Sequence, residues 1–353
     1  MSDSNPAPVR RSPLPSPWRW LGPPMAGLFS SCVAVRRGAY ACGLLQARRA
    51  AVPVLSVGNL TAGGTGKTPA VACLVRGLKE RGRRPAVLLR GYGAPSLGEL
   101  NDEGQELARQ FPDVPVVANP CRAAGAAEAV RRGADTVVLD DGFQHWALAR
   151  DFDLVLLDAT DPWGGGHRLP WGYLREAPSA LARAQVILLT RADLISPERR
   201  AELRDEVRAL APQALLGTAR HRPCGLRALR ADAPAPALEA LRGRRVFAVC
   251  GLAHPEHFHA ALKALGVELA GTRSFADHHV YTEADLHACR AEACASHAEA
   301  ITITEKDASK WEGLAASTGK PPVWVLQVAF EIVEGAGALW KAVERALAIR
   351  GSG

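Results

Sequence analysis

The 353-residue sequence predicts an α/β protein made of two α/β domains and an N-terminal helix that contacts a membrane surface. Three observations carry this prediction. Short apolar runs alternate with helical patterns along most of the chain, which is typical of mostly parallel sheets covered on both faces. A proline-rich stretch, RADAPAP at 230–236, interrupts the alternation once. Finally, residues 1–51 hold seven arginines and a single aspartate, most of the net charge of +7.

The N-terminal segment 18–50 is expected to form a helix in the membrane interface. Its charge-free run from Trp20 to Val35 contains a Pro-Pro pair and is shorter than the roughly 20 apolar residues of a spanning helix. Tryptophans, leucines and flanking arginines suit a helix lying on anionic lipid. The alternative is a helix packed on the protein's own core. Residues 1–17, rich in proline and serine, are expected to be a disordered tail.

The first α/β domain is expected over residues 51–225. Buried strands are predicted at 52–57, 85–89, 114–118, 136–140, 153–158 and 185–190, with helices at about 67–82, 102–111, 122–133 and 197–210. A smaller C-terminal α/β domain is expected over 240–350. Its predicted strands are 245–250, 267–272, 299–304 and 322–327, and its helices 255–265, 282–296, a helix from 305, and 334–348.

Composition narrows the class of protein. The eight cysteines include no C-x-x-C pair, which argues against a disulfide framework or a zinc site and suits a reducing cytosol. Beyond residue 51 the chain is nearly neutral, so nothing in it requires the basic face of a nucleic-acid-binding domain. Nucleic acid is therefore not expected as a partner.

The stretch GNLTAGGTGKTP, residues 58–69, predicts a phosphate-binding loop of the P-loop NTPase type. It follows a buried strand and opens a helix, so backbone N–H groups and the helix dipole can converge on phosphates. The usual pattern G-x-x-x-x-G-K-[ST] has glycine where Thr61 stands. Lys67 would reach the β- and γ-phosphates, and Thr68 would bind Mg²⁺. The predicted nucleotide-binding residues are Thr61, Ala62, Gly63, Gly64, Thr65, Gly66, Lys67 and Thr68.

Two adjacent aspartates provide the carboxylates of a magnesium site. Asp140 and Asp141 end the predicted strand 136–140, and ligands of open parallel sheets bind at the carboxyl ends of strands. An acidic residue at such a strand end is a usual metal-holding element in phosphoryl transfer. With Thr68 they form the predicted Mg²⁺ site. A turn or helix cap is the alternative for the pair.

A second signal favours a different class of protein. LLTRADL, residues 188–194, is similar to the [NT]-K-x-D element with which GTP-binding switches read guanine, with arginine in place of lysine. The alternative function is therefore a membrane-associated P-loop GTPase switch that selects guanine through Asp193. A non-enzymatic, nucleotide-responsive scaffold is a third possibility.

Eight motifs occur in order along the chain, and as a set they resemble the tetraacyldisaccharide 4'-kinase family, the lipid A 4'-kinases of Gram-negative bacteria, over about residues 20–345. The motifs are VGNLTAGGTGKTP, RGYG (90–93), NDE (101–103), LDDGFQH (139–145), RLPWGYLRE (168–176), CGLAHPEHF (250–258), FADHH.Y (275–281) and TEKDA (304–308). The resemblance includes the threonine at the start of the loop. It implies transfer of the ATP γ-phosphate to the 4'-hydroxyl of tetraacyldisaccharide 1-phosphate, giving lipid IVA, at the cytoplasmic face of the inner membrane.

The resemblance also implies residue roles. Asp102 matches the aspartate of the family's GDE element and is expected to act as base on the sugar hydroxyl, with Lys67 as the phosphate-binding residue. His278, the first histidine of DHH, is expected to assist Asp102, although His279 could take that role. Without the resemblance, Asp102 would be interpreted as a helix N-cap and His278 as a loop histidine. The resemblance implies an active site in a cleft of which the C-terminal domain forms the other side, and Arg175 is carried over as a residue of this cleft. The sequence departs from the family at Asn101, where the family has glycine.

Overall fold

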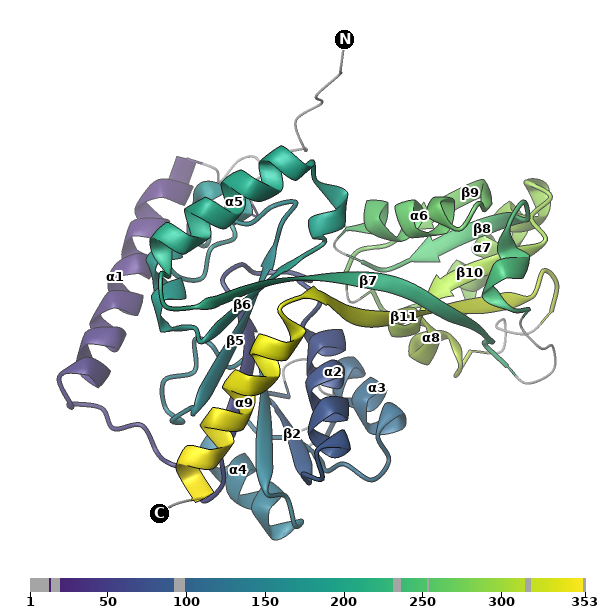
Figure 1. Ribbon diagram of the computed structural model, residues 1–353. Helices are drawn as coiled ribbons and strands as arrows, with labels where there is room; N and C mark the ends of the chain where they lie inside the picture. The colour runs from purple at the N-terminus through teal and green to yellow at the C-terminus, as the bar shows by residue number, and fades with distance from the viewer. Residues whose placement is uncertain are drawn as a thin grey trace. The chain divides into compact units, whose positions relative to one another are not determined.

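A computed structural model describes residues 13, 20–91, 99–230, 236–252, 254–277, 279–314 and 319–351. The chain forms two compact units (Figure 1). One comprises residues up to Arg220 together with those from Phe330 onward, and the other comprises His221–Ala329. The predicted domains differ from these two units in one respect. Residues 330–350 are predicted to belong to the second domain, but they are part of unit 1.

Unit 1 is built on a parallel sheet with the strand order β3-β2-β4-β1-β5-β6-β7. Strands β1, β2, β4, β5 and β6 are buried along their whole length, as their continuous apolar sequences predict. The strands are β1 (Val54–Asn59), β2 (Pro85–Leu89), β3 (Val116–Ala118), β4 (Thr136–Asp140), β5 (Phe152–Asp158), β6 (Val186–Thr190) and β7 (Leu215–Ala228).

Helices cover both faces of this sheet. They are α2 (Lys67–Glu80), α3 (Asp102–Gln110), α4 (Arg122–Arg131), α5 (Pro197–Leu210) and α9 (Ala336–Gly351), with short 3₁₀ turns at Gly164–Gly166, Pro178–Arg183 and Ala192–Leu194. Apolar side chains of α2, α3 and α9 join one core and those of α4 and α5 lie in cores on the opposite face. The mostly parallel α/β fold predicted from the sequence is thereby confirmed.

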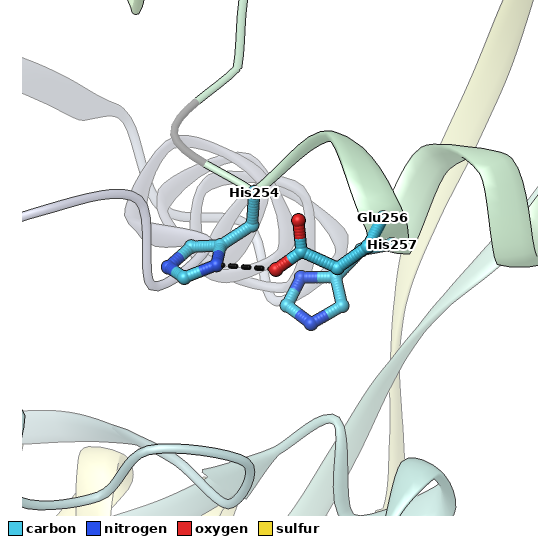
Figure 2. Close-up of side chains that lie close together, drawn as sticks. All are labelled: His254, Glu256 and His257. Carbon is cyan, nitrogen blue, oxygen red and sulfur yellow. Dashed lines mark hydrogen bonds and ion pairs between the residues drawn. The ribbon is translucent and has the colours of Figure 1, made fainter. Parts of the chain in front are cut away.

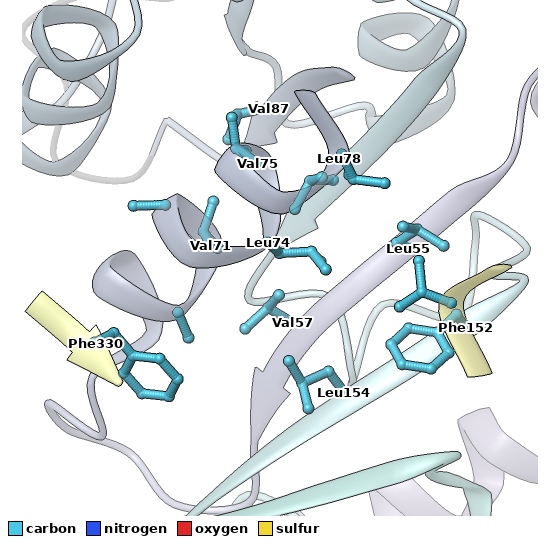
Figure 3. Close-up of a cluster of buried hydrophobic side chains, with 14 of the residues drawn as sticks. Leu55, Val57, Val71, Leu74, Val75, Leu78, Val87, Phe152, Leu154 and Phe330 are labelled. Carbon is cyan, nitrogen blue, oxygen red and sulfur yellow. The ribbon is translucent and has the colours of Figure 1, made fainter. Parts of the chain in front are cut away.

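Helix α2 illustrates how sequence spacing creates this core. Its apolar residues recur at helical spacing and pack with residues of β1, β2 and β5, as Figure 3 shows. The facing side chains include Val71, Leu74, Val75 and Leu78 on the helix and Leu55, Val57, Phe152 and Leu154 on the strands. Leu339 and Val343 of α9 belong to the same core. The last helix therefore packs in unit 1, because its apolar side completes the core around α2.

Unit 2 has a smaller parallel sheet with the order β11-β10-β8-β9. Its strands are β8 (Arg245–Cys250), β9 (Glu268–Ser274), β10 (Ala300–Thr304) and β11 (Val323–Glu334), and its helices are α6 (Pro255–Ala264), α7 (Glu283–Ala295) and α8 (Glu305–Trp311), with a 3₁₀ turn at Leu238–Leu241. Side chains of α7 and α8 share one core and those of α6 another. The boundaries between the units fall inside β7 and β11.

The N-terminal helix α1 (Gly22–Ala41) forms as predicted, with prolines at its first turn. It packs on unit 1 near its start, where a Cβ on Gly22 would lie 2.8 Å from Trp171. Along its other side, Met25, Leu28, Cys32 and Val35 form an exposed stripe at helical spacing. None of the helices in the described part of the chain is long and apolar enough to span a membrane. The predicted tail falls outside the described residues except at residue 13.

Candidate active site

The loop between β1 and α2 has the geometry of a phosphate loop. Gly66 adopts a left-handed conformation with φ of 86° and caps α2, so the helix begins at Lys67. Buried Thr65 accepts a hydrogen bond from Asn59 Nδ2 at 2.8 Å, which ties the loop to the end of β1. The N-terminus of a 14-residue helix therefore faces the concave side of the loop.

Thr61, in the position where glycine is usual, fits because a second segment supports it. Thr61 is buried and forms an isolated β-bridge with Leu174. On either side of it, Ala62 N donates to Tyr173 O at 2.7 Å and Arg175 N donates to Leu60 O at 2.8 Å. The motif RLPWGYLRE thus holds the start of the phosphate loop. Thr61 does not have the positive φ that would require glycine at its position.

The two aspartates lie beside the loop in contrasting environments. Asp140 pairs in register with Val57 of β1, and its Oδ1 is buried without a hydrogen-bond partner among the described residues. Burial, with the charges of Glu103 and Asp141, raises the pKa of Asp140 to about 7, although Lys67 and Arg122 oppose the shift. A buried carboxylate oxygen without a partner beside a phosphate loop fits the preference of Mg²⁺ for oxygen ligands.

Asp141 is held in a different way. It has a left-handed φ of 52°, and both of its oxygens accept from Arg175 Nη1, at 2.7 and 2.6 Å. Lys67 Nζ lies 3.8 Å from Asp141 Oδ1. Burial alone would raise the pKa of Asp141, but the charges of Lys67 and Arg175 and the Arg175 hydrogen bonds outweigh it and lower the pKa. This aspartate is therefore an ionised partner that positions the lysine and arginine.

Arg122 is a site residue that the sequence did not reveal. Its side chain is buried at the start of α4, and Nη2 donates to the backbone oxygen of Asp140 at 3.2 Å. Its Nη1 is buried without a hydrogen-bond partner in the part of the chain that the structure describes. Burial lowers the pKa of Arg122 to about 10, so it remains a cation at neutral pH. From the sequence alone, an arginine in the first turn of an amphipathic helix is expected at the surface. Arg122 also belongs to none of the eight motifs, so its burial could not be predicted.

Arg191, from the element similar to a guanine-reading motif, binds the phosphate loop and the end of β5. Its Nη2 donates to Gly64 O at 3.0 Å, and its Nη1 pairs with Asp158 at the end of β5. Asp193, which would read guanine, is exposed in a 3₁₀ turn. The arginine therefore supports the phosphate loop from β6.

Asp102 is the first residue of α3, and the interpretation of it as an N-cap is wrong. Asn101 is the cap, since its side chain accepts from Gly104 N at 3.0 Å. The substitution at Asn101 therefore preserves a defined helix start, with Asn101 as the capping residue. Glu103, which follows Asp102, lies close enough to Asp140 to raise its pKa. This places the first turn of α3 near the carboxylate of Asp140.

His278 lies outside the described residues, but its neighbours in unit 2 are well fixed. The His279 ring stacks on Phe275 with centroids 4.6 Å apart, and its Nε2 lies 3.1 Å from Asp285 Oδ2. Tyr281 OH donates to the buried carboxylate of Asp307 at 2.9 Å. Of the predicted site residues, Lys67 lies close to Asp140 and Asp141 in unit 1, and Thr68 follows Lys67 in the first turn of α2.

Unit 2 also contains a group of histidines at the start of α6. Figure 2 shows His254, Glu256 and His257, whose potential ligand atoms lie within 4.8 Å of one another. His254 Nδ1 and Glu256 Oε1 already form a hydrogen bond at 2.7 Å. The positive end of the helix dipole favours the Glu256 carboxylate there and opposes a cation. We therefore interpret the group as a hydrogen-bonded helix start.

A glycine-rich loop opening a helix with a lysine, flanked by a strand-end aspartate pair on a parallel sheet, defines a P-loop nucleotide-binding protein. A model of the tetraacyldisaccharide-1-P 4'-kinase (LpxK) family matches residues 18–348. The chain belongs to this family, which makes it a kinase and confirms the resemblance drawn from the motifs. The GTPase interpretation is not favoured.

Individual relatives agree with this assignment. The chain is 46% identical over 329 residues to the tetraacyldisaccharide 4'-kinase of Anaeromyxobacter dehalogenans strain 2CP-C, covering 88% of this chain and 86% of the relative. It is 38% identical over 301 residues to the enzyme of Syntrophus aciditrophicus, covering 79% and 80%. The crystal structure of LpxK from Aquifex aeolicus in complex with ATP matches with a TM-score of 0.70 and 27% identity, over 93% of this chain and 99% of that one.

Proposed function

We propose that this kinase transfers the γ-phosphate of ATP to the 4'-hydroxyl of tetraacyldisaccharide 1-phosphate, giving lipid IVA in lipid A biosynthesis. Family membership supports the reaction class. The observation that carries the site assignment is the Asp140 carboxylate, buried beside the phosphate loop with one oxygen lacking a hydrogen-bond partner among the described residues. We assign the nucleotide phosphates to residues 61–68 and the divalent cation to Thr68, Asp140 and Asp141.

In the proposed phosphate transfer, each of these residues has a different role. Mg²⁺, when bound, would neutralise charge on the phosphate oxygens. Lys67 can turn to the β- and γ-phosphates because its contact with Asp141 is long, at 3.8 Å, and Asp141 keeps Arg175 as a partner. The sugar 4'-oxygen attacks the γ-phosphorus, the bond to the bridging oxygen of ADP breaks, and Asp102 accepts the hydroxyl proton. Arg122 and Arg175 add positive charge near the carboxylates.

Of the two adjacent histidines, we assign the assisting role to His278. The His279 ring is already engaged by Asp285, Phe275 and Tyr281, whose ring centroid lies 5.0 Å away. Turning it toward a substrate would break these contacts, so a structural role suits His279 better. A histidine beside the Asp102 carboxylate would hold it oriented and share the proton.

We further propose that the protein works at the cytoplasmic face of the inner membrane, with α1 lying on the bilayer. The acyl chains of the substrate reside in a membrane, and α1 exposes an apolar stripe beside the exposed Arg36 and Arg37. Such a helix would bring the phosphate loop to a lipid surface without crossing it.

The decisive experiment measures transfer of labelled γ-phosphate from ATP to tetraacyldisaccharide 1-phosphate in detergent micelles, with GTP in parallel. We expect labelled lipid with ATP and Mg²⁺, little product with GTP, and loss of product in Asp140→Asn. Hydrolysis of nucleotide without labelled lipid would contradict the proposed acceptor, and preference for GTP would contradict the proposed donor.

A further inference from the structure

Helix α8 contains the motif TEKDA, to which the proposed reaction gives no role. The helix begins after Thr304, whose hydroxyl donates to Asp307 Oδ2 at 2.6 Å and accepts from Asp307 N at 3.2 Å. Asp307 is fully buried and also accepts from the backbone N–H of Gly251 at 3.0 Å. A buried carboxylate with this many donors is an anchor for the chain around it.

Three side chains of α8 contact the segment 275–281, each at a different residue. Lys306 Nζ pairs with Asp277 Oδ1 at 2.5 Å, and Lys310 Nζ donates to the carbonyl oxygen of His279 at 3.1 Å. Asp307 Oδ1 accepts from Tyr281 OH. Residues four apart lie on the same side of a helix, which lets Lys306 and Lys310 reach alternate residues of the segment.

The contacts are shielded from water to different degrees. Tyr281 is buried, and burial together with Asp307 raises its pKa, so its hydroxyl keeps the proton that it donates. The pair of Lys306 and Asp277 is half-buried, with side-chain exposures of 20% and 30%. Such a pair fixes geometry more than it contributes to stability, because much of its Coulomb energy is screened.

A second helix holds the same segment. Asp285 forms the capping box of α7 with Thr282, and the same Oδ2 that accepts from Thr282 N lies beside His279 Nε2. Residues 277, 279 and 281 are therefore each attached to a helix of unit 2. Position 278 lies between two of these attached residues in the chain.

We propose that α8 is a positioning element of the kinase: Lys306, Asp307 and Lys310 hold Asp277, His279 and Tyr281, the residues on either side of the assisting histidine. This inference rests on the proposed function, which assigns His278 its role. The lysines act through the segment and are positioning residues, so their loss should slow phosphate transfer without weakening the binding of ATP.

The test compares Lys306→Ala and Lys310→Ala with Lys263→Ala, an exposed lysine of α6 in the same unit. We expect kcat for lipid phosphorylation to fall about 10- to 100-fold in the first two, because a displacement of about 1 Å at a reacting group can cost that much. The KM for ATP and the thermal midpoint should stay unchanged. Lys306→Arg should recover most of the activity, and Lys263→Ala should match the wild type.

Two further measurements separate positioning from other effects. Hydrogen exchange of the amides of 276–281 should quicken in Lys306→Ala, and Lys306→Ala should cause little additional loss when His278→Ala is already present. Unchanged exchange in 276–281, or an equal loss on the His278→Ala background, would overturn the proposal. If the wild-type protein labels no lipid, the proposed function fails instead, and the exchange data still decide whether α8 holds the segment.

Discussion

Adjacent residues in this protein have opposite electrostatic roles. Asp140 is a buried carboxylate with an oxygen that lacks a partner among the described residues, and its pKa is raised to about 7. Asp141 turns into the left-handed region and joins Arg175 and Lys67. The backbone turn at Asp141 therefore gives the two proposed cation ligands different surroundings, because only Asp141 also pairs with Arg175 and Lys67. A DD pair in sequence does not reveal this division.

Asp102→Asn is expected to abolish most phosphate transfer. General-base catalysis typically contributes about 10²- to 10⁴-fold, so kcat should fall by about that factor while ATP still binds. Nucleotide affinity and lipid phosphorylation would be measured on the same preparation. Asp113→Asn, which changes an aspartate just beyond α3 that pairs with Lys79, is the matched control. Wild-type turnover in Asp102→Asn would remove this residue from the mechanism.

His145, in the LDDGFQH motif, is expected to make stability depend on pH. Burial first, and then the charges of Arg122, Arg150, Arg36 and Arg90, lower its pKa to about 4. The unfolded chain, with an ordinary pKa of about 6.5, binds the proton more readily, so the stabilisation is present above pH ~6.5 and is lost as the pH falls toward 4. Chemical denaturation at several pH values should show a shallower loss in His145→Gln, and an identical slope would refute this assignment.

At the scale of elements, packing between strand ends shapes the site. Gly58 near the end of β1 lies against Phe143, so closely that a Cβ there would sit 2.5 Å from Phe143 Cβ and 2.9 Å from its backbone N. This contact packs Phe143, in the segment that follows β4, against the end of β1, just before the phosphate loop. It explains why the chain needs glycine at this point of a buried strand.

Gly58→Ala should therefore destabilise unit 1 by about 1–3 kcal/mol, the usual cost of overpacking a core. Gly64→Ala is the matched control for stability, since a Cβ at Gly64 would meet nothing within 4 Å. Urea denaturation of both variants checks the difference. Equal midpoints would mean that the strand shifts to accept the methyl group.

The exposed stripe of α1 gives a separate prediction about membrane contact. Leu28→Asp should weaken binding to vesicles of anionic lipid, because it places a charge among Met25, Cys32 and Val35. Ala34→Asp adds the same charge to the same helix, away from the stripe, and should weaken binding less. Co-sedimentation with vesicles at fixed salt provides the comparison, and equal losses would indicate that only net charge matters.

Elements with a simple local signal could be predicted from the sequence. Strands such as 136–140 are continuous apolar runs, and the phosphate loop has a pattern that follows from its chemistry. The burial of Arg122 and the packing of α9 could not be predicted, because a helical pattern reveals an apolar side but not the core that it joins. The roles of Asp102 and His278 came from the family resemblance and stay predictions.

At the scale of the whole molecule, unit 1 is assembled from two distant parts of the chain. Leu339 and Val343 of α9 are buried in the core around α2, and Trp340 lies where a Cβ on Gly77 would approach to 2.1 Å. Arg350 adds an ion pair with Asp151 at 3.0 Å. In the sequence, unit 2 thus lies between the two segments that form unit 1, the first ending at Arg220 and the second beginning at Phe330.

Leu339→Ala is expected to lower the free energy of unfolding by about 2–5 kcal/mol, the range for emptying a buried leucine site. Ile349→Ala changes an exposed residue of the same helix and should be nearly neutral. Similar midpoints for both variants would show that α9 contributes little to unit 1.

The late position of α9 in the chain has a consequence for biosynthesis. The apolar helix α1 leaves the ribosome early, whereas the nucleotide-binding unit lacks a part of its core until residues 336–351 have been translated. At about 5–20 residues per second, translation of the residues between α1 and α9 takes about 15 seconds to a minute. With the proposed membrane contact of α1, a nascent chain would reach a lipid surface before it can bind nucleotide stably.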